Sequence, residues 1–296
     1  MYNTISFDAQ QHSSEEIGHA LAENGCVLIR NALDRARALQ AGKAIEENGK
    51  QLHEIVGKPV NDMPLCFADR DCPNPTAEAS NDFSDPLTVS GMDRSWYYEG
   101  DRNYKPWFWE HGREFPNTIF QLLQQSILPD VYANCFQEDY ICSYAQSVVR
   151  YQSAALKHQS YPFHQDGCYH SRDPKDHTGI TTWIPLVDCG VDAPSLQLYP
   201  KAIDEILPMP PGEKEPNLFC DEELVMDRYG NKLWSPEMRA GDLMVFNAFV
   251  VHRTYITPEM NVQRQSVDIR VFPKSRLPTY VKSEPYWKVD LLNELR

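Results

Sequence analysis

The chain of 296 residues carries a formal net charge of −14, with a pI near 5.1, and no run of Lys or Arg offsets this charge. Because an acidic surface repels polyanions, we expect no nucleic-acid partner. We also expect no membrane partner, because no apolar stretch approaches the roughly 18 residues of a membrane span. The expected location is cytoplasmic, because the N-terminus lacks a basic and apolar leader and the eight cysteines contain no CxxC pair.

The length suits one large domain, and we predict a single domain over residues 1–296. Residues 13–55 are expected to form two helices around the first strand. Ser13 and the two glutamates after it are typical of a helix start, and Gly25 ends that helix. Residues 26–29 are apolar and predict a short buried strand. The segment 34–52 has one apolar and one charged face, which predicts a helix on the outside of a sheet.

Residues 57–116 are rich in proline and irregular in pattern. They contain an aromatic cluster, namely Trp96, Tyr97, Tyr98, Tyr104, Trp107, Phe108 and Trp109. Long irregular segments inside a compact domain usually serve as lids or binding insertions. The aromatic residues either line a substrate pocket, where ring faces would suit an apolar or cationic molecule, or fill the flank of the core. After this insertion, residues 118–128 predict a helix that Pro129 ends.

Residues 140–275 are predicted to form the β-rich core. Residues 140–152 alternate in polarity and are rich in β-formers. Shorter segments broken by Gly, Pro and Asp follow at 161–166, 179–186, 195–199, 241–246, 249–254 and 264–272. Many short strands after N-terminal helices predict a mainly β fold with flanking helices. The expected architecture is an antiparallel jelly roll, that is, a cupin-like double-stranded β-helix with helices on one outer face.

The motif Tyr161-Pro-Phe-His-Gln-Asp-Gly places His164 and Asp166 two residues apart. On an extended strand these side chains would share one face. His252 follows a later strand, and two histidines with one carboxylate are the ligands of non-haem iron sites that keep open positions. Arg264, twelve residues after His252, offers a planar guanidinium for the far carboxylate of a keto acid, and Arg270 is a rival for that role.

In this order the motifs resemble those of the phytanoyl-CoA dioxygenase family of Fe(II)/2-oxoglutarate oxygenases. The motifs are His164-Gln165-Asp166, Trp183-Ile-Pro-Leu186, Gly241-Asp-Leu-Met-Val-Phe246, His252 and Arg264. The resemblance implies a jelly-roll core, Fe(II) held by His164, Asp166 and His252, 2-oxoglutarate as co-substrate and O2 as oxidant. It also implies that the co-substrate contacts Arg264, Thr254, Trp183 and Gln146.

The expected activity is hydroxylation, or a related oxidation, of a C–H bond in a small organic molecule, with release of succinate and CO2. Family members that chlorinate have a small residue in place of the carboxylate, so the resemblance with Asp166 present implies hydroxylation. The family's Pro-Gly-Ser-His turn is replaced by Ser195-Leu-Gln-Leu-Tyr-Pro200, so the substrate class does not transfer.

Two other functions are compatible with the motifs. The chain could be a jelly-roll protein that binds a small molecule without catalysis. It could also be a zinc hydrolase that uses His164, Asp166 and His170, although Gly167 and the polar residues after His170 indicate a loop that would not align the second imidazole. His158 and His177 are expected to be solvated loop residues.

Overall fold

The computed structural model describes residues 4–44, 122–152, 161–169, 177–212 and 219–278. The aromatic-rich insertion at 57–116, His158 and His170 lie outside these residues. In the described part, no helix is both long and apolar enough to cross a membrane.

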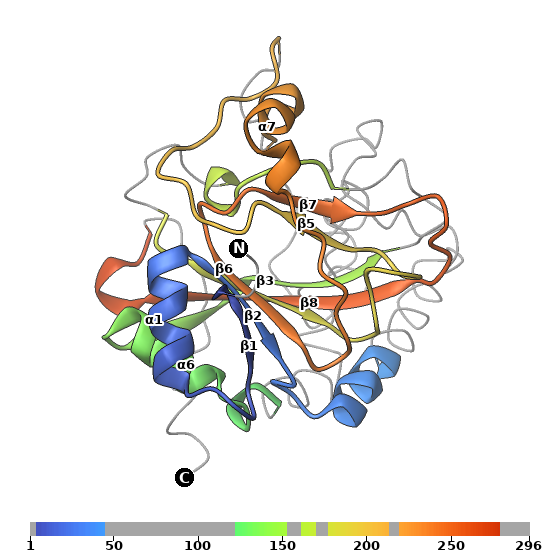
Figure 1. The fold of residues 1–296 in the computed structure, drawn as a ribbon. Helices are drawn as coiled ribbons and strands as arrows, with labels where there is room; N and C mark the ends of the chain where they lie inside the picture. Colours follow the sequence, from blue (N-terminus) through green and yellow to red (C-terminus); the bar gives the residue numbers. More distant parts are fainter. Residues whose placement is uncertain (1–3, 45–121, 153–160, 170–176, 213–218, 279–296) are drawn as a thin grey trace, which may run out of the picture.

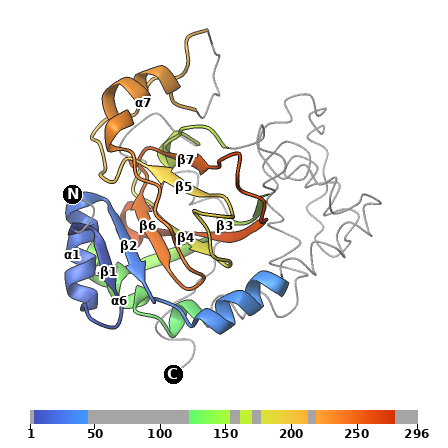
Figure 2. The ribbon, with the colours of Figure 1, turned by 45° about the vertical axis from the view of Figure 1, so that its right-hand side comes forward.

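Two β-sheets face each other in the described part of the chain (Figures 1 and 2). The strands are β1 Ser6–Asp8, β2 Cys26–Arg30, β3 Tyr140–Gln152, β4 Ile180–Pro185, β5 Ser195–Leu198, β6 Leu243–Asn247, β7 His252–Tyr255 and β8 Arg264–Pro273. The larger sheet has the order β1-β2-β6-β4-β8-β3, and the smaller sheet pairs β5 with β7. All neighbouring strands are antiparallel except β1 and β2, which are parallel.

Two helices cover the outer face of the larger sheet. They are α1 Ser14–Asn24 and α6 Leu128–Phe136, which pack side by side in Figure 1. Ser13 accepts a hydrogen bond from the backbone of Glu16, and Gly25 ends α1 in a left-handed conformation. The buried side chains between these helices and the sheet include Ile17, Leu21 and Val131 from the helices. From the sheet they include Val27, Ile29, Val245, Val267, Ile269 and Val271. The predicted β-rich core with flanking helices is confirmed.

The space between the sheets holds a second apolar cluster. It includes Leu28, Trp183, Met244 and Phe246 from the larger sheet and Leu196 and Leu198 from the smaller one. Helix α7 Glu222–Tyr229 lies beyond the smaller sheet, at the top of Figure 1, where its Val225 packs against Phe163 and Val251. Short 3-10 turns complete the described elements, namely η5 Asp166–Tyr169, η7 Gly230–Lys232 and η8 Lys274–Arg276.

Several predicted elements differ from those observed. Of the predicted helix 118–128, residues 122–124 are helical and residues 118–121 lie outside the described residues. Pro129 does not end this helix but stands in the first turn of α6, because the first turn of a helix leaves unpaired the N–H that proline lacks. Of the predicted helix 34–52, residues 35–44 are helical and the remainder lies outside the described residues. The sequence analysis missed β1, which has three residues, and α7, in which one side chain is buried and helical periodicity is weak.

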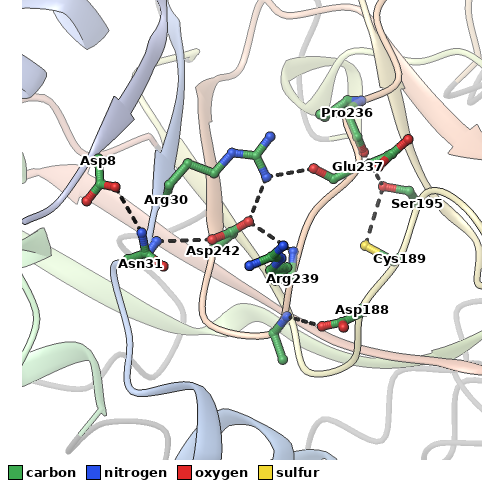
Figure 3. Close-up of polar contacts among 11 residues, drawn as sticks. Asp8, Arg30, Asn31, Asp188, Cys189, Ser195, Pro236, Glu237, Arg239 and Asp242 are labelled. Atoms are coloured by element: carbon green, nitrogen blue, oxygen red, sulfur yellow. Dashed lines mark hydrogen bonds and ion pairs between the residues drawn. The ribbon is translucent and has the colours of Figure 1, made fainter.

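The Gly241-Asp242 pair anchors the start of β6. The carboxylate of Asp242 is buried and accepts hydrogen bonds from Arg30 Nη1 at 2.7 Å and from the backbone N–H groups of Asn31 and Arg239 at 3.0 and 2.9 Å (Figure 3). Gly241 has a φ of +100°, and a Cβ there would lie 2.7 Å from the carbonyl oxygen of Leu33. The motif is therefore required by the fold, at a point where β2 and β6 are tied together.

Replacing Asp242 with alanine should lower the free energy of unfolding by about 2–4 kcal/mol, because two backbone N–H groups and a guanidinium lose the buried carboxylate to which they donate. Urea denaturation followed by circular dichroism measures this change. The matched control is Asp139→Ala, since Asp139 is 84% exposed and pairs with Lys274 only at 3.6 Å. Equal stability of the two variants would contradict an anchoring role for Asp242.

Candidate metal centre

His164 and His252 lie side by side although 88 residues separate them in the sequence. Their backbones exchange two hydrogen bonds, with N–H to O distances of 2.9 and 3.0 Å, in an isolated antiparallel bridge. This pairing brings the two imidazole rings together, with centroids 4.0 Å apart. The bridge lies where the chain enters β7, so the smaller sheet positions both rings.

The hydrogen bonds of the two histidines determine which ring nitrogens are available. Nδ1 of His164 lies 2.8 Å from the carbonyl oxygen of Pro162, and Nδ1 of His252 lies 3.0 Å from that of Val250. A carbonyl can only accept, so each Nδ1 carries the proton and each Nε2 keeps its lone pair. Burial lowers the pKa of His252 in spite of the nearby Asp166 carboxylate, which favours the neutral imidazole that binds metals.

Asp166 presents one carboxylate oxygen to both Nε2 atoms. Its Oδ1 lies 3.8 Å from Nε2 of His164 and 3.9 Å from Nε2 of His252, and no described residue donates a hydrogen bond to it. Burial raises the pKa of Asp166, but the Arg270 guanidinium, the two imidazoles and the Thr181 hydroxyl together hold it well below its usual range. The carboxylate is therefore ionised and has one oxygen available as a ligand.

These three groups fit a divalent metal ion such as Fe(II). Their ligand atoms lie within 4.8 Å of one another, and all three side chains are buried. Two ligands at about 2.1 Å from one ion and at right angles lie roughly 3 Å apart, so each of the two contacts between Asp166 Oδ1 and a histidine Nε2 needs to shorten by less than about 1 Å. A buried carboxylate oxygen without a donor, facing two imidazole lone pairs, is the arrangement that an ion would complete.

The local backbone around these residues differs from the predicted strand. Residues 161–166 do not form one, because His164 makes only the isolated bridge and the chain turns into η5 at Asp166. The prediction of a solvated His177 is also wrong, since this side chain is 6% exposed and its ring contacts Phe249. A Cβ on Gly167 would lie 2.6 Å from the His177 ring, so glycine permits this close packing next to Asp166.

Gln165, between the two ligands, supports the site in a way that the sequence analysis missed. Its Nε2 donates to the carbonyl oxygens of Glu205 and Phe249 at 2.9 and 3.0 Å, and its Oε1 accepts from Leu207 N at 2.8 Å. The side chain is fully buried and points away from the ligand atoms into two flanking loops. The sequence contains one signal for this role, because Gln165 is a polar residue in a motif whose neighbouring residues are all expected to be buried.

The remaining predicted residues lie on four strands, Thr254 on β7, Arg264 on β8, Trp183 on β4 and Gln146 on β3. His252 and Thr254 share the buried face of β7, and Thr254 Oγ1 accepts a hydrogen bond from Tyr161 N at 3.2 Å. Arg264 is 2% exposed, with its Cζ 5.4 Å from the centre of the Trp183 ring. Gln146 lies in β3, within the interruption of the β3–β8 register, and its side chain is outside the described part.

Strand β8 has one polar and one apolar face. Arg264, Ser266, Asp268 and Arg270 alternate with Val267, Ile269 and Val271, which pack under α1 and α6. The polar face therefore points between the sheets. On this face Arg270 lies against Asp166 at 2.6 Å, whereas Arg264 lies against Trp183. The two arginines that the sequence left as rivals for one role thus have different surroundings.

The chain was compared with known families, curated proteins and solved structures. A family model described as phytanoyl-CoA dioxygenase matches residues 21–256. No curated protein matches the chain significantly. Among solved structures, the non-heme alpha-ketoglutarate-dependent carbocyclase SnoK from nogalamycin biosynthesis superposes with a TM-score of 0.54 at 14% identity, covering 90% of this chain and 85% of that chain.

EctD from S. alaskensis in its apo form superposes with a TM-score of 0.53 at 13% identity, covering 96% of this chain and 86% of that chain. EctD with 2-oxoglutarate and 5-hydroxyectoine gives a TM-score of 0.52 at 16% identity, covering 91% and 80%. At these identities the structures establish a shared jelly-roll fold. The predicted fold class and the resemblance seen in the motifs are confirmed.

Proposed function

Because this chain belongs to the phytanoyl-CoA dioxygenase family, and is thus a non-haem enzyme that depends on Fe(II) and 2-oxoglutarate, we propose that it hydroxylates or otherwise oxidises a C–H bond of a small organic molecule. The observation that carries this proposal is the meeting of His164, Asp166 and His252 at one buried point. When bound, Fe(II) and 2-oxoglutarate supply the oxidising chemistry, in which decarboxylation to succinate is coupled to oxidation of the substrate.

We assign His164, Asp166 and His252 as the Fe(II) ligands. Two neutral imidazoles and one carboxylate leave the ion with net positive charge, which favours binding of the anionic keto acid. The three ligands on one side leave three positions for exchangeable groups. The bonds from both Nδ1–H groups to backbone carbonyls hold the imidazole rings in place, so the lone pairs face the ion before it binds.

We assign the co-substrate pocket to the interior beside β7 and β8. There the Arg264 guanidinium pairs with the distal carboxylate of 2-oxoglutarate, and Trp183 restricts the position of the guanidinium. The Thr254 oxygen accepts from Tyr161 N–H, which leaves its own proton free for a carboxylate oxygen. Gln146 stays a predicted neighbour of the co-substrate. Burial of Arg264 and Thr254 excludes water and strengthens both contacts.

We further propose one domain over residues 1–296 and a cytoplasmic location. The net charge of −14 disfavours a polyanionic substrate. A small apolar or cationic molecule is therefore the substrate class that we propose.

Two measurements test the proposed function. Under anaerobic conditions, Fe(II) with 2-oxoglutarate should give a weak visible charge-transfer band. With O2 and a panel of small amines, amino acids and natural-product scaffolds, succinate release should then rise above the rate without substrate. A band with no succinate release for any compound would favour a non-catalytic binding protein, whereas hydrolysis supported by Zn(II) and dependent on His170 would favour a hydrolase.

A further inference from the structure

The two oxygens of the Asp166 carboxylate have different partners. Oδ2 accepts a hydrogen bond from Thr181 Oγ1 at 2.5 Å and forms an ion pair with Arg270 Nη1 at 2.6 Å. Arg270 Nη1 also donates to Thr181 Oγ1 at 2.9 Å, so the three groups form a closed triangle. Oδ1, in contrast, has no donor among the described residues and faces the two Nε2 atoms. The carboxylate is thus held by one oxygen and open at the other.

Sheet register creates this arrangement. Thr181 in β4 and Arg270 in β8 are directly opposite each other in the antiparallel pair. Side chains at opposite positions project from the same face, so the hydroxyl and the guanidinium reach Asp166 together. Both come from the middle of the larger sheet, whereas His252 begins a strand of the smaller one. The two sheets therefore hold opposite sides of the proposed metal centre.

We propose that Arg270 and Thr181 are positioning residues that keep Asp166 a one-oxygen ligand of Fe(II), an inference that rests on the proposed function. A carboxylate can bind a metal through one oxygen or two. With two imidazoles, a two-oxygen carboxylate would occupy four of six positions, and the keto acid would take the other two. Holding Oδ2 away from the ion keeps a further position exchangeable while 2-oxoglutarate is bound.

The strength of the triangle supports this assignment. The side chain of Asp166 is 4% exposed and that of Arg270 is 14% exposed, so water and salt screen their attraction weakly. Hydrogen bonds between charged groups at such distances are about twice as strong as neutral ones. Turning Oδ2 toward the metal would break both the hydrogen bond with Thr181 and the ion pair with Arg270. The one-oxygen mode is therefore the favoured one.

Nitric oxide is a suitable probe of the exchangeable position, because it is uncharged and so responds little to the loss of the arginine charge. It binds Fe(II), and electron paramagnetic resonance measures the complex. Titrations would compare wild type with Arg270→Met, each with and without 2-oxoglutarate and without oxygen. The control is Arg276→Met, because Arg276 is 61% exposed and pairs with Glu138 at 3.6 Å, away from Asp166. Circular dichroism verifies that each variant is folded.

In Arg270→Met, nitric oxide affinity should fall at least about tenfold when 2-oxoglutarate is bound. Without 2-oxoglutarate the affinity should stay unchanged, because a two-oxygen carboxylate and two imidazoles still leave two of the six positions exchangeable. Thr181→Val, which removes one donor and no charge, should change affinity in the same direction by a smaller factor. If Arg270→Met does not fold, Thr181→Val and Arg270→Lys test the proposal in its place.

Equal nitric oxide affinity of wild type and all these variants in the presence of 2-oxoglutarate would overturn the positioning role. Equal losses with and without 2-oxoglutarate would indicate general damage to the centre and would also overturn it. If the wild-type protein itself binds no Fe(II) with 2-oxoglutarate, the proposed function fails instead. The two failures are therefore distinguishable.

Discussion

Replacing Asp166 with alanine should reduce succinate release at least about 100-fold. Mutation of groups that merely support metal ligands typically costs 10–100-fold in metal affinity or activity, and Asp166 is assigned as a ligand itself. Its Oδ1 faces both imidazoles, so its loss removes the anionic member of the set. Affinity for Co(II), measured by titration calorimetry on the protein without iron, should fall in parallel with turnover.

The Asp166→Ala substitution also leaves Arg270 and Thr181 without the acceptor they share. These two donors could hold a small carboxylate, so added formate should restore part of the Co(II) affinity of Asp166→Ala. Formate should have no effect on the wild-type protein. Asp139→Ala is the control for the removal of a carboxylate, because its side chain is 84% exposed. Wild-type turnover in Asp166→Ala would refute the ligand assignment.

Replacing Arg264 with methionine should raise the KM for 2-oxoglutarate by about 10–100-fold. The expected loss corresponds to a charge-assisted contact of about 1.5–3 kcal/mol between the guanidinium and the distal carboxylate. Methionine is close to the arginine stem in size and apolar, so the contact with Trp183 is kept in part. Initial rates at varied 2-oxoglutarate concentration measure the effect.

A keto acid without a distal carboxylate separates recognition from general damage. Wild type should bind 2-oxoglutarate far more tightly than 2-oxobutyrate, and Arg264→Met should lose most of this preference. Arg228→Met is the matched control, since Arg228 pairs with Glu205 at the surface and is 41% exposed. A preference for 2-oxoglutarate that survives in Arg264→Met would show that another cation, for example Arg270, binds the distal carboxylate.

The elements that were predicted correctly are those with a strong local signal. Helix α1 has a capping serine, acidic residues in its first turn and a terminal glycine, and each of these acts within a few residues. Strand β3 shows a long alternation of β-formers. The prediction failed where local pattern was ambiguous. Pro129 is compatible with either end of a helix, and the eight residues of α7 bury too little to show a period.

The candidate site was predictable because its residue types are chemically restrictive. An imidazole and a carboxylate two residues apart, followed by a distant histidine and an arginine, suit few functions other than metal binding. The family resemblance then supplied the pairing of His164 with His252. The backbone bridge that creates this pairing could not be derived, since it joins segments 88 residues apart and depends on how two sheets face each other.

The β-rich class, the family and the candidate metal ligands could be read from the sequence, because strand patterning and ligand chemistry depend on the residues themselves. Tertiary contacts were needed to show that Gln165 faces away from the three candidate ligands, that Asp242 anchors β6 and that Arg270 lies on Asp166 rather than beside Arg264. The physical reason is strand register. Thr181 lies opposite Arg270 because β4 pairs with β8 in this register. No local sequence pattern specifies that pairing.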